Sequence, residues 1–136
     1  MKEELKGPKM TEAGVAVVRE QNEKGELIYN VYLINFYNTK LEGVLVTSVG
    51  YATHPDTQEE IKTSTLRHSL GDIPAKSYKK IEPIIEEVFG LNNEYWVSFW
   101  IADQMYDKKF IFLTESISES NFVKVPLIEK RGVLIK

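Results

Sequence analysis

The chain offers few side chains that could carry out a reaction. Its two histidines are His54, two residues before Asp56, and His68, four residues before Asp72. A metal site built from His and Asp needs three or more converging ligands, and neither pair has a spacing that brings such ligands together. His and Asp residues in loops are more often turn formers in contact with solvent. We therefore expect no metal ion and no other cofactor.

A nucleophilic serine is not indicated either. Ser64 and Ser69 lie close to His68 in the segment TSTLRHSLGD, but a catalytic triad needs a strained turn, an oxyanion hole and partners from separate elements. The adjacent glutamates at 59–60 and 86–87 would point to opposite faces of a strand, whereas acid–base chemistry needs two carboxyl groups that converge. No glycine-rich phosphate loop precedes a helix. The sequence therefore favours a binding function over catalysis.

Length and composition point to one ordinary globular domain. A chain of 136 residues is most simply a single domain, and 43% hydrophobic with 27% charged residues is typical of globular proteins. The net charge of -3 leaves no basic excess to follow a phosphate backbone, so we expect no nucleic-acid partner. The absence of cysteine excludes disulfides and thiolate sites.

The start of the chain gives an expectation about its location. Its first ten residues include five charged ones and lack the apolar centre of a signal peptide, and no apolar run approaches the ~20 residues that a membrane helix needs. We expect a cytoplasmic protein with no membrane association. Residues 1–12 are polar and are expected to form a flexible lead-in, followed by one domain over residues 13–136.

Most of the chain consists of short β-rich segments separated by turn signals. The segments expected to form strands are 13–21, 26–37, 41–51, 58–68, 73–81, 95–102 and 110–113, with two short edge strands within 121–136. Turns are expected at Asn22–Gly25 and Ser69–Asp72. Residues 83–89 are the helical candidate because Pro83 suits a first helical turn; a strand ending near Ile85 is the alternative. We predict a single all-β sandwich of about seven strands with at most one short helix.

The hairpin formed by residues 95–113 is the most apolar part of the chain. Strand alternation places Tyr95, Val97, Phe99 and Ile101 on one face, and Trp96, Ser98, Trp100 and Ala102 on the other. Because only Ser98 is polar, both faces are expected to be covered. The C-terminal segment 122–136 is one candidate cover for the two tryptophans. The alternative is an aromatic surface for a partner chain, since Trp and Tyr concentrate in interface cores.

Two segments resemble immunoglobulin-like domains. Asn30–Ser48 resembles the strand–turn–strand at the middle of such sheets, and Leu91–Phe99 resembles the entry to the sixth strand of fibronectin type III domains. The resemblance implies a β-sandwich in which Tyr95 is the corner tyrosine, with its hydroxyl bonded to backbone upstream. The chain departs from the immunoglobulin pattern because it has no cysteine pair and no tryptophan in an early strand.

We expect a non-catalytic protein-interaction or assembly module that uses the aromatic sheet face, with self-association as one form of it. Trp96 and Trp100 are the expected contacts, and Tyr106 at the hairpin turn is a lesser one. A β-sandwich that binds carbohydrate or another small ligand is the first alternative, because aromatic rings on such a face stack on sugars. The second alternative is an enzyme with an unrecognised site that includes His54, His68 or Tyr78.

Overall fold

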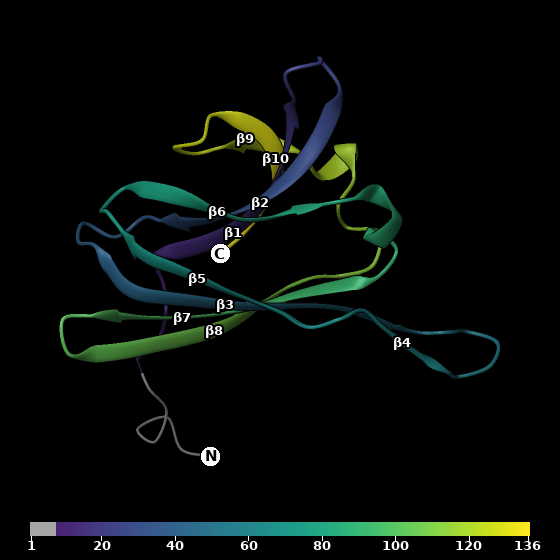
Figure 1. Ribbon diagram of the computed structural model, residues 1–136, viewed down its shortest axis with the longest axis horizontal. Helices are drawn as coiled ribbons and strands as arrows, with labels where there is room; N and C mark the ends of the chain where they lie inside the picture. Colours follow the sequence, from purple (N-terminus) through teal and green to yellow (C-terminus); the bar gives the residue numbers. More distant parts are fainter. Residues whose placement is uncertain (1–7) are drawn as a thin grey trace.

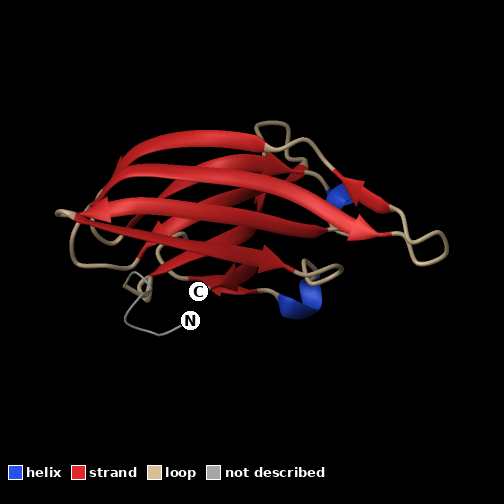
Figure 2. Cartoon of the chain, turned by 90° about the horizontal axis from the view of Figure 1, so that it is seen from below, coloured by secondary structure: helices blue, strands red, loops and turns tan. Residues whose placement is uncertain are grey.

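The computed structural model describes residues 8–136 and shows an all-β sandwich of two antiparallel sheets (Figures 1 and 2). The ten strands of this part are β1 (Ala13–Gln21), β2 (Leu27–Asn35), β3 (Leu41–Thr53), β4 (Glu60–Lys62), β5 (Leu66–Ile73), β6 (Ser77–Ile84), β7 (Asn92–Ile101), β8 (Gln104–Phe112), β9 (Val123–Val125) and β10 (Lys130–Ile135). Two single-turn 3-10 helices, η2 (Glu86–Val88) and η3 (Glu119–Asn121), lie at the same end of the sandwich (Figure 2). The predicted all-β sandwich is confirmed, with ten strands in place of about seven.

The strands divide between the sheets in a way that leaves β7 central. The first sheet has the order β6-β2-β1-β10-β9, and the second has the order β4-β3-β7-β8. β5 and β4 pair with the same edge of β3, β5 with its first part and β4 with its last three residues. The β3–β4 hairpin projects beyond the body of the sandwich (Figure 1).

The first hairpin follows directly from its turn residues. Asn22 Oδ1 accepts hydrogen bonds from the backbone N–H groups of Lys24 and Glu26, and Gly25 adopts a φ of 80° that favours glycine. The turn fixes the register in which β1 and β2 pair along their whole lengths. The predicted turn at Asn22–Gly25 and the strand over 13–21 are confirmed.

The expected turn at Ser69–Asp72 is wrong, because β5 continues through these residues. Gly71, at a φ of 68°, lies at an irregularity in the pairing of β5 with β3. We interpret this irregularity as a β-bulge, which accommodates an extra residue with a positive φ while the strand continues in the same direction. The chain instead turns between β5 and β6, where Lys76 has a positive φ of 53°.

Pro83 lies in a strand and does not begin a helix. β6 extends to Ile84, and helical geometry is limited to the single turn of η2. β6 is the edge strand of the first sheet, where a residue without a backbone N–H is tolerated. The alternative of a strand ending near Ile85 is therefore the better prediction.

The core fills the space between the sheets and includes a residue from the expected lead-in. Its largest fully buried side chains include Tyr95, Phe99, Phe110, Phe112, Leu33 and Leu41. Met10 also packs into this core, and the Thr11 N–H donates to the Tyr37 hydroxyl, so the end of the expected lead-in contacts the domain. The rest of that lead-in, residues 1–7, lies outside the described residues.

Candidate functional site

The outer face of the second sheet carries four large apolar side chains that are about half exposed. They are Leu45 on β3 (54% exposed), Trp96 and Trp100 on β7 (46% and 45%) and Met105 on β8 (44%). Trp100 lies opposite Met105, and Leu45 lies opposite Ser98, the residue midway between the two tryptophans. These four residues form one surface, which we call the tryptophan face.

Strand alternation in β7 is as predicted, but the covering of its outer row is not. Tyr95, Val97 and Phe99 are buried in the core, as expected for one row. The expectation that both faces are covered is wrong, because the row that contains Trp96 and Trp100 is exposed to solvent.

The C-terminal segment is part of the other sheet. β10 pairs with β1, and Val125 and Ile128 pack with Ala16 and Ile34 in a separate apolar cluster of the first sheet. The close pairing of β10 with β1 depends on Gly132, since a Cβ at this position would lie 2.1 Å from the Val17 carbonyl oxygen. The proposed cover of the tryptophans by residues 122–136 is therefore wrong.

Neighbouring side chains orient the Trp96 indole ring. The Trp96 Nε1–H donates to Asp107 Oδ2 at 3.3 Å, and the Lys109 ammonium lies 4.8 Å from the centre of the Trp96 ring, within the range of a cation–π interaction. Trp100 lies beside Gly43, where a Cβ would be 3.8 Å from its ring. The contacts with Asp107 and Lys109 limit the conformational freedom of the Trp96 ring.

Tyr106 does not share this surface. It pairs with Phe99 across β7 and β8, and the two rings stack with their centroids 5.7 Å apart. Tyr37 contributes a third ring on the same inner side, 6.3 Å from Tyr106. The sequence grouped Tyr106 with the tryptophans, whereas the register places it on the opposite face.

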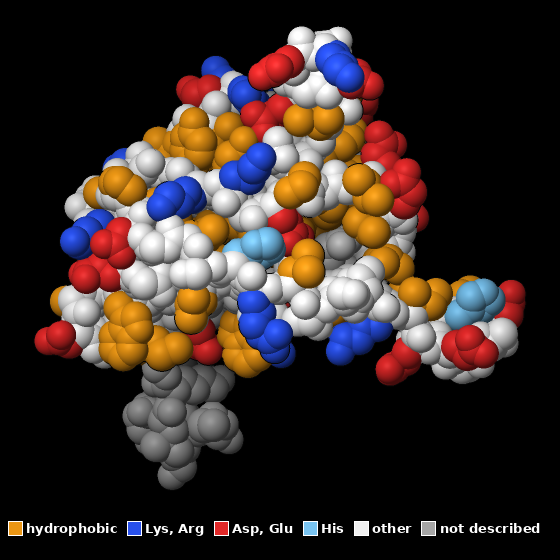
Figure 3. Space-filling view, viewed as in Figure 1, with side chains coloured by type: hydrophobic (Ala, Val, Ile, Leu, Met, Phe, Trp, Pro, Cys, Tyr) orange, Lys and Arg blue, Asp and Glu red, His pale blue; other side chains and the backbone are white. Residues whose placement is uncertain are grey.

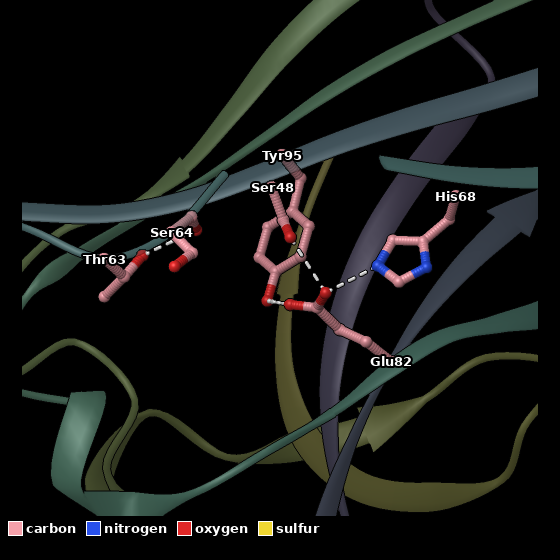
Figure 4. Close-up of polar contacts among 6 residues, drawn as sticks. All are labelled: Ser48, Thr63, Ser64, His68, Glu82 and Tyr95. Carbon is pink, nitrogen blue, oxygen red and sulfur yellow. Dashed lines mark hydrogen bonds and ion pairs between the residues drawn. The ribbon is translucent and has the colours of Figure 1, made fainter. Parts of the chain in front are cut away.

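A second feature lies where the two sheets meet along β5 and β6. The Glu82 carboxylate on β6 accepts hydrogen bonds from Ser48 Oγ (2.8 Å), His68 Nε2 (2.7 Å) and the Tyr95 hydroxyl (3.0 Å) (Figure 4). Glu82 belongs to the first sheet, and its three partners belong to β3, β5 and β7 of the second. Only 13% of the Glu82 side chain is exposed. We call these four residues the Glu82 cluster, which joins the two sheets.

Tyr95 shows how the cluster differs from the expected tyrosine corner. Burial, and then the adjacent Glu82 carboxylate, raise the pKa of Tyr95 well above its usual value, so the phenol stays protonated and donates to Glu82. The resemblance to fibronectin type III domains implied a hydroxyl bonded to backbone upstream. The observed acceptor is a side-chain carboxylate thirteen residues upstream, so that expectation is wrong in its partner.

The Glu82 cluster borders a cleft of about 280 Å³ between the sheets. Apolar side chains that line it include Val49, Leu66, Ile84 and Val88, and the polar side chains include Thr63, Ser64 and Asn93. In Figure 3 a hollow lies beside a histidine and an acidic side chain on this edge, with hydrophobic side chains along its rim. We call this space the inter-sheet cleft.

The other candidate residues are dispersed. His54 lies in the projecting β3–β4 hairpin, where its Nδ1 accepts the Asp56 N–H. Asp72 accepts the Gly43 N–H, and His68 bonds to Glu82 instead of lying with Asp72. Residues 8–136 contain no group of three or more His, Cys, Asp or Glu side chains arranged to hold a metal ion.

Four residues of these two features were missed in the sequence. Leu45 and Met105 lie in mixed polar and apolar rows, so only the strand register shows that they adjoin the tryptophans. Glu82 and Ser48 are separated by 34 residues. One sequence feature could have indicated Glu82: its carboxylate lies between the apolar residues Ile81 and Ile84. A carboxylate buried at such a position needs hydrogen-bond donors.

Comparison of the chain with protein-family models, with curated proteins and with solved structures gave no match. Within residues 8–136, no helix has the length and hydropathy that crossing a bilayer would require.

Proposed function

We propose that the protein is a non-catalytic interaction module that associates with a second copy of itself through the tryptophan face. The observation that supports this most strongly is the set of four half-exposed apolar side chains on adjacent strands. Contiguous apolar patches on soluble proteins mark interaction sites, and tryptophan is enriched among the residues that dominate binding energy.

Charges around the tryptophan face suit pairing with an identical surface. Lys109 lies beside Trp96, and Arg67 lies in the same cross-strand row beyond Thr47. Asp107 and Glu94 lie in the neighbouring rows. A two-fold interface brings each patch against its own copy, so a patch that carries both signs of charge can place cations opposite carboxylates. A patch of a single sign would repel its copy.

The size of the face sets the expected strength. β7 has ten residues, which span about 33 Å, and four strands about 4.8 Å apart give the whole outer face of the second sheet, which includes the tryptophan face, an area on the order of 600 Å². Stable interfaces bury about 800 Å² per partner, and smaller ones belong to weak complexes. We therefore expect a dimer that dissociates on dilution.

The resemblance to immunoglobulin-like domains also belongs to this proposal. Immunoglobulin sandwiches place strands A, B and E in one sheet and C, F and G in the other. We infer that β1, β2 and β6 correspond to the first group and β3, β7 and β8 to the second, with the tail strands β9 and β10 as an addition. The division of strands between the sheets supports this correspondence.

The proposal is tested by measuring solution mass across a concentration series for the natural protein and for the double variant Trp96→Ser/Trp100→Ser. Loss of two central tryptophans should weaken association at least ~100-fold, since such residues typically contribute 2 kcal/mol or more each. Leu45→Glu is a second variant, because it places a charge in the middle of the same face without removing a ring. Leu27→Ser, at an exposed position on the first sheet, is the control and should leave the mass unchanged.

The fold of each variant is checked by thermal unfolding. Association lost in the double variant and in Leu45→Glu, with the fold retained, would support the proposal. A double variant that simply unfolds would show that the rings are core, and a natural protein that stays monomeric at all concentrations would refute self-association. A monomer that binds a different protein through these same residues would keep the interaction function but change the partner.

Carbohydrate binding is a second candidate because polar side chains lie beside the rings. Thr47, Ser98 and Asp107 share the outer face with Trp96 and Trp100, so an aromatic platform and hydrogen-bonding groups occur together. Calorimetric titration with a panel of glycans separates this candidate from self-association. Saturable heat that disappears in Trp96→Ser/Trp100→Ser but not in Leu27→Ser would favour a sugar ligand.

A further inference from the structure

The inter-sheet cleft has an unusual hydrogen-bonding character, because all but one of its side-chain hydroxyl and amide donors are already used within the protein. Ser48 and Tyr95 both donate to Glu82. Each hydroxyl has one proton, so each oxygen can now only accept. An ionised carboxylate accepts about four hydrogen bonds, and Glu82 receives three, two at Oε1 and one at Oε2. Oε2 therefore keeps a free acceptor position.

The remaining polar groups of the cleft follow the same pattern. Asn93 uses its amide N–H groups on the carbonyls of Val88 and Leu91, which leaves its oxygen as the free end. The Thr63 hydroxyl donates to the Ser64 carbonyl. Ser64 has no hydrogen-bond partner for its own hydroxyl within residues 8–136, so it is the exception in this part of the chain.

Three backbone positions of the cleft offer no free donor. Pro83, which lines the cleft beside Glu82, has no N–H to offer. The Gly50 N–H donates to Thr63 Oγ1, and the Thr63 N–H returns a bond to the Gly50 carbonyl. A molecule that enters the cleft therefore meets mainly acceptors and one carboxylate, with the Ser64 hydroxyl as a free donor, surrounded by aliphatic side chains.

We propose that the inter-sheet cleft binds a primary ammonium group carried on an aliphatic chain. An ammonium group has three donors, no acceptor and a positive charge, which matches Glu82 Oε2 and the oxygens of Tyr95 and Ser48. These oxygens lie within 3.0 Å of the carboxylate that they contact, so one ammonium can reach more than one of them. The aliphatic chain packs against Leu66, Ile84 and Val88.

The size of the cleft agrees with a ligand of this kind. Its volume is about 280 Å³, whereas an apolar cavity of about 150 Å³ already accommodates benzene. A six-carbon amine fits within this space with its head group at Glu82. This site is separate from the tryptophan face, so a test of either one can fail without affecting the other.

The test is an NMR titration of the ¹⁵N-labelled natural protein with three probes of equal chain length: n-hexylammonium, n-hexanol and hexanoate. We expect saturable shifts from n-hexylammonium at the amides of Gly50, Ser64 and Asn93, and affinity at least ~10-fold weaker for the alcohol, which lacks the charge. Hexanoate should give no saturable shifts, because it brings acceptors and a negative charge to an acceptor-lined cleft.

A lysine side chain could supply the same chemistry as a free amine, so Nα-acetyl-lysine N-methylamide is a fourth probe. Binding of this compound as well would support a peptide lysine as the source, and binding of n-hexylammonium alone would support a small amine. Glu82→Gln should weaken the binding of n-hexylammonium at least ~10-fold. The comparison of ligands uses only the natural protein, so it does not depend on the variant being folded. Hexanoate that binds as well as the amine, no saturable shift with n-hexylammonium, or shifts scattered away from the cleft would overturn the proposal.

Discussion

Replacement of Glu82 by Gln probes how strongly the Glu82 cluster holds the two sheets together. The substitution keeps the shape of the side chain but exchanges one oxygen and the negative charge for an NH₂ group. Ser48, His68 and Tyr95 all donate to the carboxylate. The single amide oxygen of Gln accepts two hydrogen bonds at most, so at least one of the three donor bonds to this side chain is lost.

The expected cost follows from these contacts. Hydrogen bonds to a charged group contribute about 1.5–3 kcal/mol each, compared with about 0.5–1.5 kcal/mol for neutral ones, and a buried donor left without an acceptor costs about 1–3 kcal/mol. Loss of charge on two bonds and loss of the third therefore lowers the free energy of unfolding by roughly 3 kcal/mol. This is a large part of the 5–15 kcal/mol that stabilises a typical domain.

Urea unfolding followed by far-UV circular dichroism measures the change. Glu23→Gln, in the exposed β1–β2 turn, is the matched control and should alter stability by less than ~0.5 kcal/mol. Tyr95→Phe removes one donor and should cost about 1–2 kcal/mol. The double variant should cost less than the sum of the two single changes, because both remove the same bond.

The reasoning would be refuted by a Glu82→Gln protein whose unfolding free energy lies within ~0.5 kcal/mol of the natural value. Strict additivity of Glu82→Gln and Tyr95→Phe would also contradict it, since residues that share a hydrogen bond should be coupled.

Three further changes have expected effects on stability. Burial raises the pKa of Glu20, but hydrogen-bond donors that include Lys130 outweigh it and lower this pKa from its ordinary value of 4.5. The ionised Glu20 side chain therefore stabilises the fold at neutral pH, and this contribution is lost as the pH falls below 4.5. The difference in urea midpoint between the natural protein and Glu20→Gln should vanish in acid. Gly132→Ala would force a Cβ to within 2.1 Å of the Val17 carbonyl oxygen and should therefore abolish hydrogen-exchange protection along β10. Retained protection would show that β1 and β10 can separate at little cost. Asn35→Asp points a carboxylate at three backbone carbonyls that accept hydrogen bonds from the Asn35 amide in the natural protein. It should lower the free energy of unfolding by about 3 kcal/mol and lower the thermal midpoint with it. An unchanged midpoint would mean that the amide bonds contribute little.

Strand periodicity predicted much of the fold because it depends on local alternation. The β1 strand, the turn at Asn22–Gly25 and the buried row that contains Tyr95 and Phe99 all follow from side-chain period and turn chemistry. Errors arose where glycine and proline have two structural uses. Gly71 forms a bulge instead of a turn, and Pro83 sits in an edge strand instead of starting a helix.

The candidate sites depend on long-range pairing, which a single sequence does not contain. The exposure of Trp96 and Trp100 is decided by where the last strand goes, and Gly132 allows that strand to pair with β1 in the first sheet. The apolar composition of the row was visible in the sequence, but its cover was not. Glu82 likewise meets its partners only once the two sheets are stacked.

The most direct test of self-association through the tryptophan face combines solution mass by light scattering with tryptophan emission on the same samples, over a dilution series. Trp96 and Trp100 are the two tryptophans of the chain, so the emission reports on this face alone. We expect a dimer with blue-shifted emission at high concentration and a monomer with red-shifted emission on dilution, with both signals changing together. A monomeric mass and constant emission at every concentration would contradict the proposed function, and a dimer whose emission stays red-shifted would place its interface elsewhere.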